Sequence, residues 1–278
     1  MQKIAVVGLE KNGVWEFFNK LEKFKNGNIE FVPFIYSTRS DNLYDTLEIN
    51  GNKIEDFAAA VSVGGDGTFL YTSRIFAGTD VPIFGVNKGH LGFNTSIEAD
   101  EFNMYFKRFI ENNIEYDYKS LLDVSLDDSD KIYTALNEGV ISYCGISRTI
   151  RLKVDIDNIP LCDFRGDGLI ISSPTGSTAY NLSAGGPILH PSVDAFVLTP
   201  ICPMTLAIRP FIIPFDKSVN IRIEESSSTS QITLDGQKII NLKAGQIIKI
   251  KKSKNRIKII KGHKNFSEVL KTKLGWMV

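Results

Sequence analysis

The protein has 278 residues, of which 43% are hydrophobic, and its 32 basic residues balance 32 acidic ones. A chain of this length forms one large or two ordinary domains, and this composition is sufficient to bury a core. The zero net charge gives no reason to expect nucleic acid or an anionic membrane as a partner.

The first part of the chain, residues 1–115, alternates strand-like and helix-like patterns. Apolar runs predict strands, and apolar residues at helical spacing predict helices. Such alternation is typical of an α/β layer with a mainly parallel sheet. The expected strands cover 3–8, 29–36, 58–63 and 82–87, and the expected helices cover 12–25, 68–77 and 98–112.

The second part, residues 116–260, predicts strand after strand and therefore an antiparallel β domain. Lysines alternate with isoleucines over 249–264, which indicates a strand pair with one solvated face. Nucleic-acid binding by that stretch is less favoured, because no aromatic platform accompanies the charge. The tail, 261–278, has a weak helical pattern and is expected to pack on the first domain. The expected strands are 121–126, 132–136, 149–156, 169–171, 219–223, 231–234 and 247–250, with a polar turn at 224–230.

A glycine-rich string, Gly64-Gly65-Asp66-Gly67-Thr68, follows the strand expected at 58–63. Glycines let a backbone approach an anion, and the N–H groups of the next helix would point at that anion. An aspartate repels phosphate, so Asp66 makes sense there if it accepts a proton from an attacking hydroxyl, or if a metal ion shields it. The alternative is that Asp66 only caps the helix.

Two rival phosphate motifs fail. Gly8 and Gly13 have P-loop spacing, but Val14-Trp15 follow where Lys-Ser/Thr is needed. No GxGxxG follows a strand, which argues against a Rossmann dehydrogenase.

The densest polar segment runs from Phe164 to Pro187. Its hydroxyls, backbone amides and Tyr180 suit a nucleoside, which presents a flat base, a ribose diol and an amide. A smaller signal is the pair Asn137-Glu138, expected inside a strand at 135–141. A buried Glu138 needs a hydrogen-bond partner, which a ribose hydroxyl would supply. The alternative for this pair is a solvent-facing strand end.

These three motifs, in this order, resemble the NAD kinase family, and segments 85–93 and 234–237 extend the resemblance. The long polar block is specific, whereas lipid kinases and phosphofructokinases share the glycine-aspartate string. The resemblance implies a Rossmann-like α/β domain followed by an antiparallel β-sandwich domain. It also implies ATP and NAD as substrates, Mg²⁺ held by the nucleotide, and a homodimer or homotetramer.

The resemblance also implies site residues. Asp66 would be catalytic and would act on the 2′-hydroxyl of the adenosine ribose of NAD. The backbone of Gly64, Gly65, Gly67 and Thr68 would hold phosphates. The implied NAD-binding residues are Asp66, Gly67, Asn137, Glu138, Arg165, Asp167, Thr178, Ala179, Tyr180, Asn181, Ser183 and Gln237.

Two positions depart from the family pattern. Tyr71 stands where a basic residue is frequent, with Arg74 as a substitute, and Met204 stands where many members carry histidine. A lipid kinase and a non-catalytic dinucleotide sensor remain alternatives. A lipid kinase would need an apolar acyl-chain pocket, and the intact Asp66 argues against a sensor.

The cysteines, the apolar runs and the histidines each add an expectation. The three cysteines are far apart and odd in number, which argues against a disulfide framework and favours a reducing compartment. No apolar run approaches the roughly 20 residues that span a bilayer, so we expect a cytoplasmic protein. Three histidines without paired spacing argue against a metal site built by the protein.

Overall fold

The computed structural model describes residues 1–10, 13–24, 28–36, 48–89, 91–144, 149–225 and 230–275. His90, most of the turn expected at 224–230 and the last residues of the tail lie outside this described part. The chain forms two compact units, one of Met1–Lys119 with Asn255–Val278 and one of Ser120–Lys254. Within the described ranges, no helix is long and apolar enough to cross a membrane.

The first unit contains a parallel sheet with the strand order β19–β6–β5–β1–β2. Its central strands are buried on both faces, so their residues form continuous apolar runs such as Ile4–Val7. The strands are β1 (Gln2–Leu9), β2 (Ile29–Tyr36), β5 (Phe57–Val63), β6 (Ile83–Asn87) and the end of β19 (Ile247–Ile260), with β7 (Ile97–Glu98) beside β6 and the short pair β3 (Glu48–Ile49) and β4 (Asn52–Lys53) apart.

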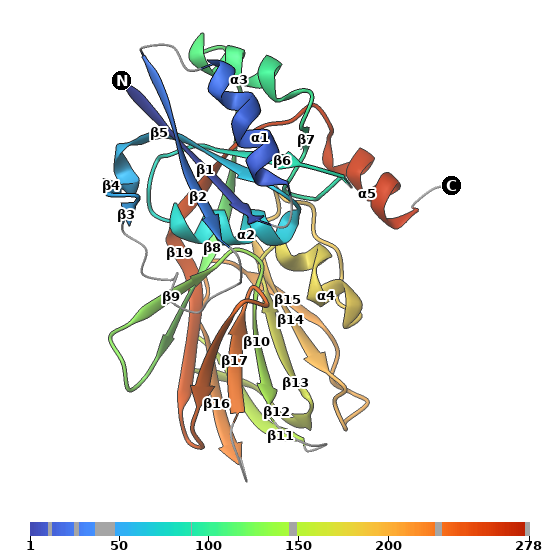
Figure 1. Ribbon diagram of the computed structural model, residues 1–278. Helices are drawn as coiled ribbons and strands as arrows, with labels where there is room; N and C mark the ends of the chain where they lie inside the picture. Colours follow the sequence, from blue (N-terminus) through green and yellow to red (C-terminus); the bar gives the residue numbers. More distant parts are fainter. Residues whose placement is uncertain are drawn as a thin grey trace. The chain divides into compact units, whose positions relative to one another are not determined.

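Helices cover both faces of this sheet (Figure 1). The β1-to-β2 and β5-to-β6 connections step in opposite directions along the sheet, so right-handed crossovers put α1 and α2 on opposite faces. An aromatic core joins α1 to α3, with the Phe17 and Phe84 rings each 5.3 Å from that of Phe102. The helices are α1 (Val14–Leu21), α2 (Asp66–Ile75), α3 (Phe102–Ile110) and α5 (Phe266–Leu274).

The second unit is a β-sandwich of antiparallel strands. One sheet has the order β15–β14–β13–β10–β17–β18, and the other contains β12–β11–β16–β19 with β8 and β9. Inward-facing aliphatic residues such as Leu152, Ile171 and Ile221 form one core. The strands are β8 (Tyr116–Leu126), β9 (Ile132–Ala135), β10 (Glu138–Tyr143), β11 (Ile150–Ile156), β12 (Ile159–Gly166), β13 (Gly168–Ser172), β14 (Ala195–Ile201), β15 (Phe211–Pro214), β16 (Val219–Glu225), β17 (Ser230–Leu234) and β18 (Lys238–Leu242).

The predicted fold class, an α/β domain followed by an antiparallel β-sandwich, is confirmed. Two local predictions were wrong. Asn137 lies in the break between β9 and β10 instead of inside one strand. Its backbone N–H and carbonyl bind Asp235 and Ser173 instead of a neighbouring strand. The lysine-rich stretch is one strand, β19, up to Ile260 and not a strand pair. Its polar middle resembles a turn, but Ser253 and Ile257 are both buried and the strand continues through it.

Candidate active site

The glycine turn lies at the carboxyl end of β5, where open α/β sheets place ligands. Gly64 has φ 153°, a backbone conformation that residues with a side chain rarely adopt. Its N–H donates to the Val86 carbonyl at 2.9 Å. Gly65 is the exposed N-cap of α2, and a methyl group added there would meet nothing within 4 Å. The fold itself therefore does not require glycine at position 65, whereas close approach of a ligand would.

Asp66 does not cap α2, because Gly65 occupies the N-cap and no side chain caps that helix. Its carboxylate instead accepts two backbone hydrogen bonds from a distant loop. The Phe93 N–H lies 3.0 Å from Oδ2 and the Asn94 N–H lies 2.9 Å from Oδ1. These contacts hold both oxygens in one orientation while 29% of the side chain stays exposed. The alternative reading of Asp66 as a helix cap was therefore wrong.

Two further glycines let this loop close around Asp66. A methyl group built on Gly92 would lie 2.3 Å from Asp66 Oδ1 and 2.1 Å from Thr95 Oγ1. A methyl group on Gly85 would lie 2.2 Å from the Asn94 carbonyl oxygen. Both distances are far inside contact range, so close packing explains the glycines at positions 85 and 92. Sequence patterns do not identify Phe93 and Asn94 as partners of Asp66, since backbone donors leave no residue signature.

The departure at Tyr71 has a packing explanation. The Tyr71 side chain is buried, with its ring centroid 4.2 Å from that of Tyr36, and burial raises the pKa of its phenol above the ordinary value. The Arg74 guanidinium lies over the same ring at 6.0 Å. The cation beside Asp66 comes instead from α5 of the same unit. Lys273 Nζ lies 3.4 Å from Asp66 Oδ2.

The second unit positions Asn137 and Glu138 through Asp235. This buried aspartate accepts hydrogen bonds from the N–H groups of Leu136 (3.0 Å), Asn137 (2.7 Å) and Glu138 (3.4 Å). Asp235 lies in the tight turn between β17 and β18, with φ 51°, and Gly236 follows with φ 61°. These values match a type I′ hairpin turn. Asp235 is a positioning residue that the sequence patterns did not reveal, although segment 234–237 contains it.

Both members of the pair are buried, so the solvent-facing alternative was wrong. Burial, with the Asp235 charge as a smaller cause, raises the pKa of Glu138 to about 8. Asn137 Oδ1 and Glu138 Oε2 have no hydrogen-bond partner within the described part of the chain. Because buried polar atoms are nearly always paired, such atoms indicate a place for a ligand or an ordered water.

The hydroxyl-rich turn packs directly on Asn137. The Ser173 N–H donates to the Asn137 carbonyl at 2.8 Å, and a methyl group on Gly176 would lie 2.2 Å from that same oxygen. Asn181 holds the turn, since its amide nitrogen donates to the carbonyls of Ser177 and Pro187, each at 3.0 Å. Its amide oxygen accepts from the Thr199 hydroxyl at 2.6 Å. Two of the predicted motifs therefore meet in this unit, with Thr178 and Ala179 half-buried and Tyr180 and Ser183 exposed.

Arg165 and Asp167 lie in a separate, exposed cluster of the second unit. The Arg165 carbonyl accepts from the Met204 N–H at 2.8 Å, and the Asp167 N–H donates to the Ile201 carbonyl at 2.9 Å. A hydrogen bond to Asp167, and the charge of that carboxylate, hold the pKa of the Cys202 thiol above its ordinary value. The half-buried Gln237 belongs to the Asp235 turn, where its N–H donates to the Leu234 carbonyl at 2.9 Å.

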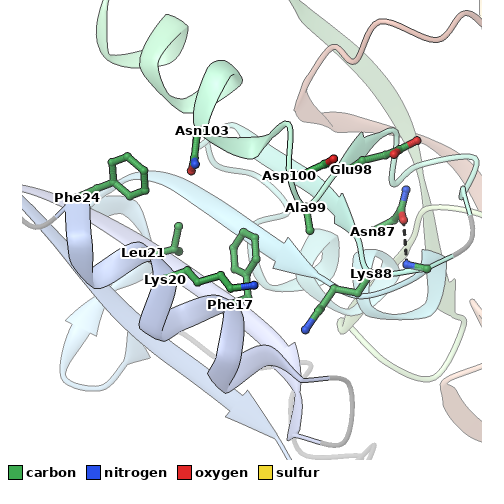
Figure 2. A pocket seen from close by; sticks show the side chains of 11 residues that line it. Phe17, Lys20, Leu21, Phe24, Asn87, Lys88, Glu98, Ala99, Asp100 and Asn103 are labelled. Atoms are coloured by element: carbon green, nitrogen blue, oxygen red, sulfur yellow. Dashed lines mark hydrogen bonds between the residues drawn. The ribbon is translucent and has the colours of Figure 1, made fainter.

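A groove of about 770 Å³ in the first unit contains none of the predicted site residues. Figure 2 shows it between α1 and the start of α3, with Lys20 and Lys88 on one side and Glu98 and Asp100 on the other. The Glu16 carboxylate pairs with both lysines, at 2.9 and 3.3 Å. Lys264 pairs with Glu98 on the other side, at 2.8 Å. We assign the groove no role. The groove is lined by Phe17, Lys20, Leu21, Phe24, Asn87, Lys88, Gly89, Glu98, Ala99, Asp100 and Asn103.

The first unit has a parallel sheet that ends in an open glycine turn at a helix start, and the second has buried oxygens without a partner in the described ranges. Together these features define a nucleotide-binding protein of the α/β plus β-sandwich class. Family models narrow this class. The ATP-NAD kinase N-terminal domain matches residues 16–114, and the ATP-NAD kinase C-terminal domain matches residues 136–262. The chain belongs to the NAD kinase family.

Individual relatives agree with this assignment. An NAD kinase of Treponema denticola is 36% identical, over 99% of this chain and 97% of the relative, and one of Aquifex aeolicus is 34% identical, over 99% and 100%. The crystal structure of an Archaeoglobus fulgidus NAD kinase in complex with ATP superposes with TM-score 0.75 at 26% identity, covering 98% of each chain. Yeast NADH kinase complexed with NADH shares the fold, with TM-score 0.84 at 22% identity over 100% of this chain and 88% of that one. Family membership removes the lipid-kinase alternative.

Proposed function

We propose that this protein transfers the γ-phosphoryl group of ATP to the 2′-hydroxyl of the adenosine ribose of NAD, which gives NADP and ADP. The observation that carries this proposal is the Asp66 carboxylate, which two loop N–H groups hold at an open glycine turn. Family membership and the relatives named NAD kinase support the identity of both substrates.

In the proposed reaction, the ribose oxygen attacks the γ-phosphorus and forms a new P–O bond. The bond from that phosphorus to the β–γ bridging oxygen breaks, and its electron pair leaves with ADP. Asp66 accepts the proton of the hydroxyl as a general base. The rest of the catalysis consists of positioning the reactants and neutralising charge on the phosphate. The backbone of Gly64, Gly65, Gly67 and Thr68 binds phosphate oxygens at the start of α2.

The second unit would bind NAD. We assign the hydrogen bonds to ribose hydroxyls to Asn137 and Glu138, whose oxygens lack partners among the described residues. Tyr180 offers an exposed ring to a base, and Asn181 acts by holding the turn that carries it. The remaining contacts are assigned to Gly67, Arg165, Asp167, Thr178, Ala179, Ser183 and Gln237.

Mg²⁺ fits this site as an ion held mainly by the nucleotide. In the described ranges, no group of three or more His, Cys, Asp or Glu side chains is arranged to hold a metal. Asp66 offers one carboxylate at the phosphate turn, and Mg²⁺ commonly takes one or two carboxylates plus substrate phosphates. When bound, the ion would neutralise charge on the phosphate oxygens.

We further propose that the protein acts as a homodimer or homotetramer in the cytoplasm. Large apolar side chains are exposed on the sandwich, with Leu206 at 83%, Met204 at 68% and Phe211 at 48%. Such a patch is typical of a subunit interface. Three free cysteines support a reducing compartment. Sedimentation of wild type against Leu206→Asp tests the interface, and we expect the variant to dissociate into smaller species.

A coupled assay tests the reaction. The protein is mixed with Mg²⁺ and with NAD or NADH, using ATP or polyphosphate as donor, and an NADP-specific dehydrogenase reports the product. We expect wild-type turnover, a roughly 10³-fold lower kcat in Asp66→Asn and wild-type kcat in Asp80→Asn, an exposed control in the same unit. Normal turnover by Asp66→Asn would remove Asp66 as the base. Tight NADP binding without turnover of any donor would favour the sensor.

A further inference from the structure

Helix α5 has defined caps at both ends and packs on the first unit through buried side chains. A capping box starts it, in which Asn265 and Glu268 exchange hydrogen bonds of 3.0 and 2.8 Å, and Gly275 ends it in the left-handed conformation. Val269 and Leu270 are buried. The Phe266 ring lies 6.3 Å from that of Phe93, the residue whose N–H binds Asp66. The helix therefore packs on the loop that orients the proposed catalytic carboxylate.

This packing brings Lys273, in the last turn of α5, to Asp66. The Lys273 ammonium lies 3.4 Å from Asp66 Oδ2 and 5.2 Å from the centre of the Phe93 ring. The side chains of Lys273 and Asp66 remain 30% and 29% exposed. Ion pairs with this much exposure contribute little to stability, so the contact has limited value as a structural brace. An ammonium carries three donors, so a lysine that contacts a carboxylate can bind a second oxyanion as well.

The glycine turn and Asp66 have opposite requirements toward a phosphate. The turn offers N–H groups to an anion, whereas the carboxylate repels one at short range. A cation beside Asp66 offsets that repulsion. The ribose oxygen must reach Asp66 to give up its proton, so the phosphorus that it attacks must come close to Asp66. A cation beside Asp66 would therefore lie close to the place where the new bond forms. Lys273 is within reach of this place through its long, flexible side chain.

We propose that Lys273 is a catalytic residue that binds the γ-phosphoryl group during transfer. This role rests on the proposed kinase function and extends it to the carboxyl-terminal helix. The Lys273 ammonium donates a hydrogen bond to a non-bridging oxygen of the γ-phosphoryl group as the new bond to the ribose oxygen forms. It exchanges no proton and forms no covalent bond, since the hydroxyl proton goes to Asp66 and the electron pair leaves with ADP.

Steady-state kinetics of the full-length protein with MgATP and NAD test this role. Lys273→Met keeps the aliphatic stem over Phe93 and removes the charge, whereas Lys273→Arg keeps the charge. We expect Lys273→Met to lower kcat about 100-fold, as loss of one transition-state donor does elsewhere, with KM for NAD within about twofold of wild type. Lys273→Arg should recover part of kcat. Lys271→Ala, an exposed lysine on the same helix, is the control and should match wild type.

Chemical rescue separates catalysis from folding. Ethylammonium added to Lys273→Ala should raise kcat at least severalfold and leave Lys271→Ala unchanged, and a purely structural role would not respond. Wild-type kcat in Lys273→Met, or a higher kcat than wild type, would overturn the role and leave the kinase function standing. Absence of rescue together with an equal loss in Lys273→Arg would also overturn it. A wild-type protein that makes no NADP would instead remove the kinase function and this role together.

Discussion

The carboxyl groups of Asp66 and Glu138 lie in opposite surroundings. Asp66, in the first unit, accepts two backbone hydrogen bonds, faces the Lys273 ammonium and stays partly exposed. Glu138, in the second unit, is buried, and its Oε2 has no partner among the described residues. Burial raises its pKa to about 8, so it carries a proton at neutral pH.

The difference shows two ways of preparing a polar group for a ligand. The first unit uses backbone donors to orient a carboxylate in advance, which suits a group that must meet a reacting atom. In the second unit, buried oxygens have no partner among the described residues, which suits groups that discriminate a bound hydroxyl from an absent one. Each of the following substitutions changes one side of this comparison.

Among these substitutions, Gly92→Ala is expected to have the largest effect on kcat. The added methyl group would collide with Asp66 Oδ1 and Thr95 Oγ1, so the carboxylate must turn away. We expect kcat to fall about 100-fold, since small misplacements of a catalytic group cost about that much, while KM for NAD changes little. Gly89→Ala is the matched control, because a methyl group there meets nothing within 4 Å. Equal kcat values in the two variants would contradict the orienting role of the loop.

Asp235→Ala tests the scaffold of the second unit. Removal of this carboxylate leaves the N–H groups of Leu136, Asn137 and Glu138 without their acceptor. We expect a loss of about 3 kcal/mol in the free energy of unfolding and a higher KM for NAD. Urea denaturation and kinetics measure the two effects. Asp128→Ala, which removes a more exposed carboxylate paired with Gln246 and Lys243, should cost about 1 kcal/mol or less. A similar cost for both variants would argue against the positioning role.

Tyr180→Ala should affect binding without affecting stability. The ring is 46% exposed, so its removal leaves no cavity in the core. Stacking of a base on an aromatic ring is worth about 1–3 kcal/mol, which predicts a KM for NAD about tenfold higher. Tyr180→Phe should stay close to wild type. An unchanged KM in Tyr180→Ala would remove the ring from the proposed NAD site.

Glu138→Gln should change the pH dependence of stability. The folded protein keeps the Glu138 proton up to about pH 8, whereas the unfolded chain releases it near 4.5. The folded state binds more protons between these values, so this group lowers the free energy of unfolding as pH rises through that window. We expect the wild-type urea midpoint to fall relative to that of Glu138→Gln between pH 5 and 8. Parallel curves would contradict the raised pKa.

Sequence patterns predicted the first unit well and the second less well. Continuous apolar runs located β1 and β5, because a parallel strand covered on both faces has a simple signature. In contrast, β12 and β14 were missed. The first is an edge strand with exposed residues such as Ile159 and Leu161, and the second contains Pro200. Neither has the alternation that marks a half-buried strand.

The candidate site divides in the same way. The motifs that contain Asp66, Asn137 and Tyr180 could be found because the chemistry of each lies in a contiguous segment. Their partners could not be found, because they are backbone groups or side chains far along the chain. The Phe93 N–H is 27 residues from Asp66, and the Asp235 carboxylate is 98 residues from Asn137.

The sequence by itself determined that strands and helices alternate in the first part of the chain and that strands follow in the second. It also determined the glycine turn after β5 and the polar block of the second unit. Local periodicity and composition encode those features, since they follow from which side chains a strand or helix must bury. Only the tertiary structure decided that Lys273, 207 residues away, meets Asp66, and that Asp235 holds the Glu138 backbone. Such contacts arise from packing between distant elements, which imposes no period on the chain.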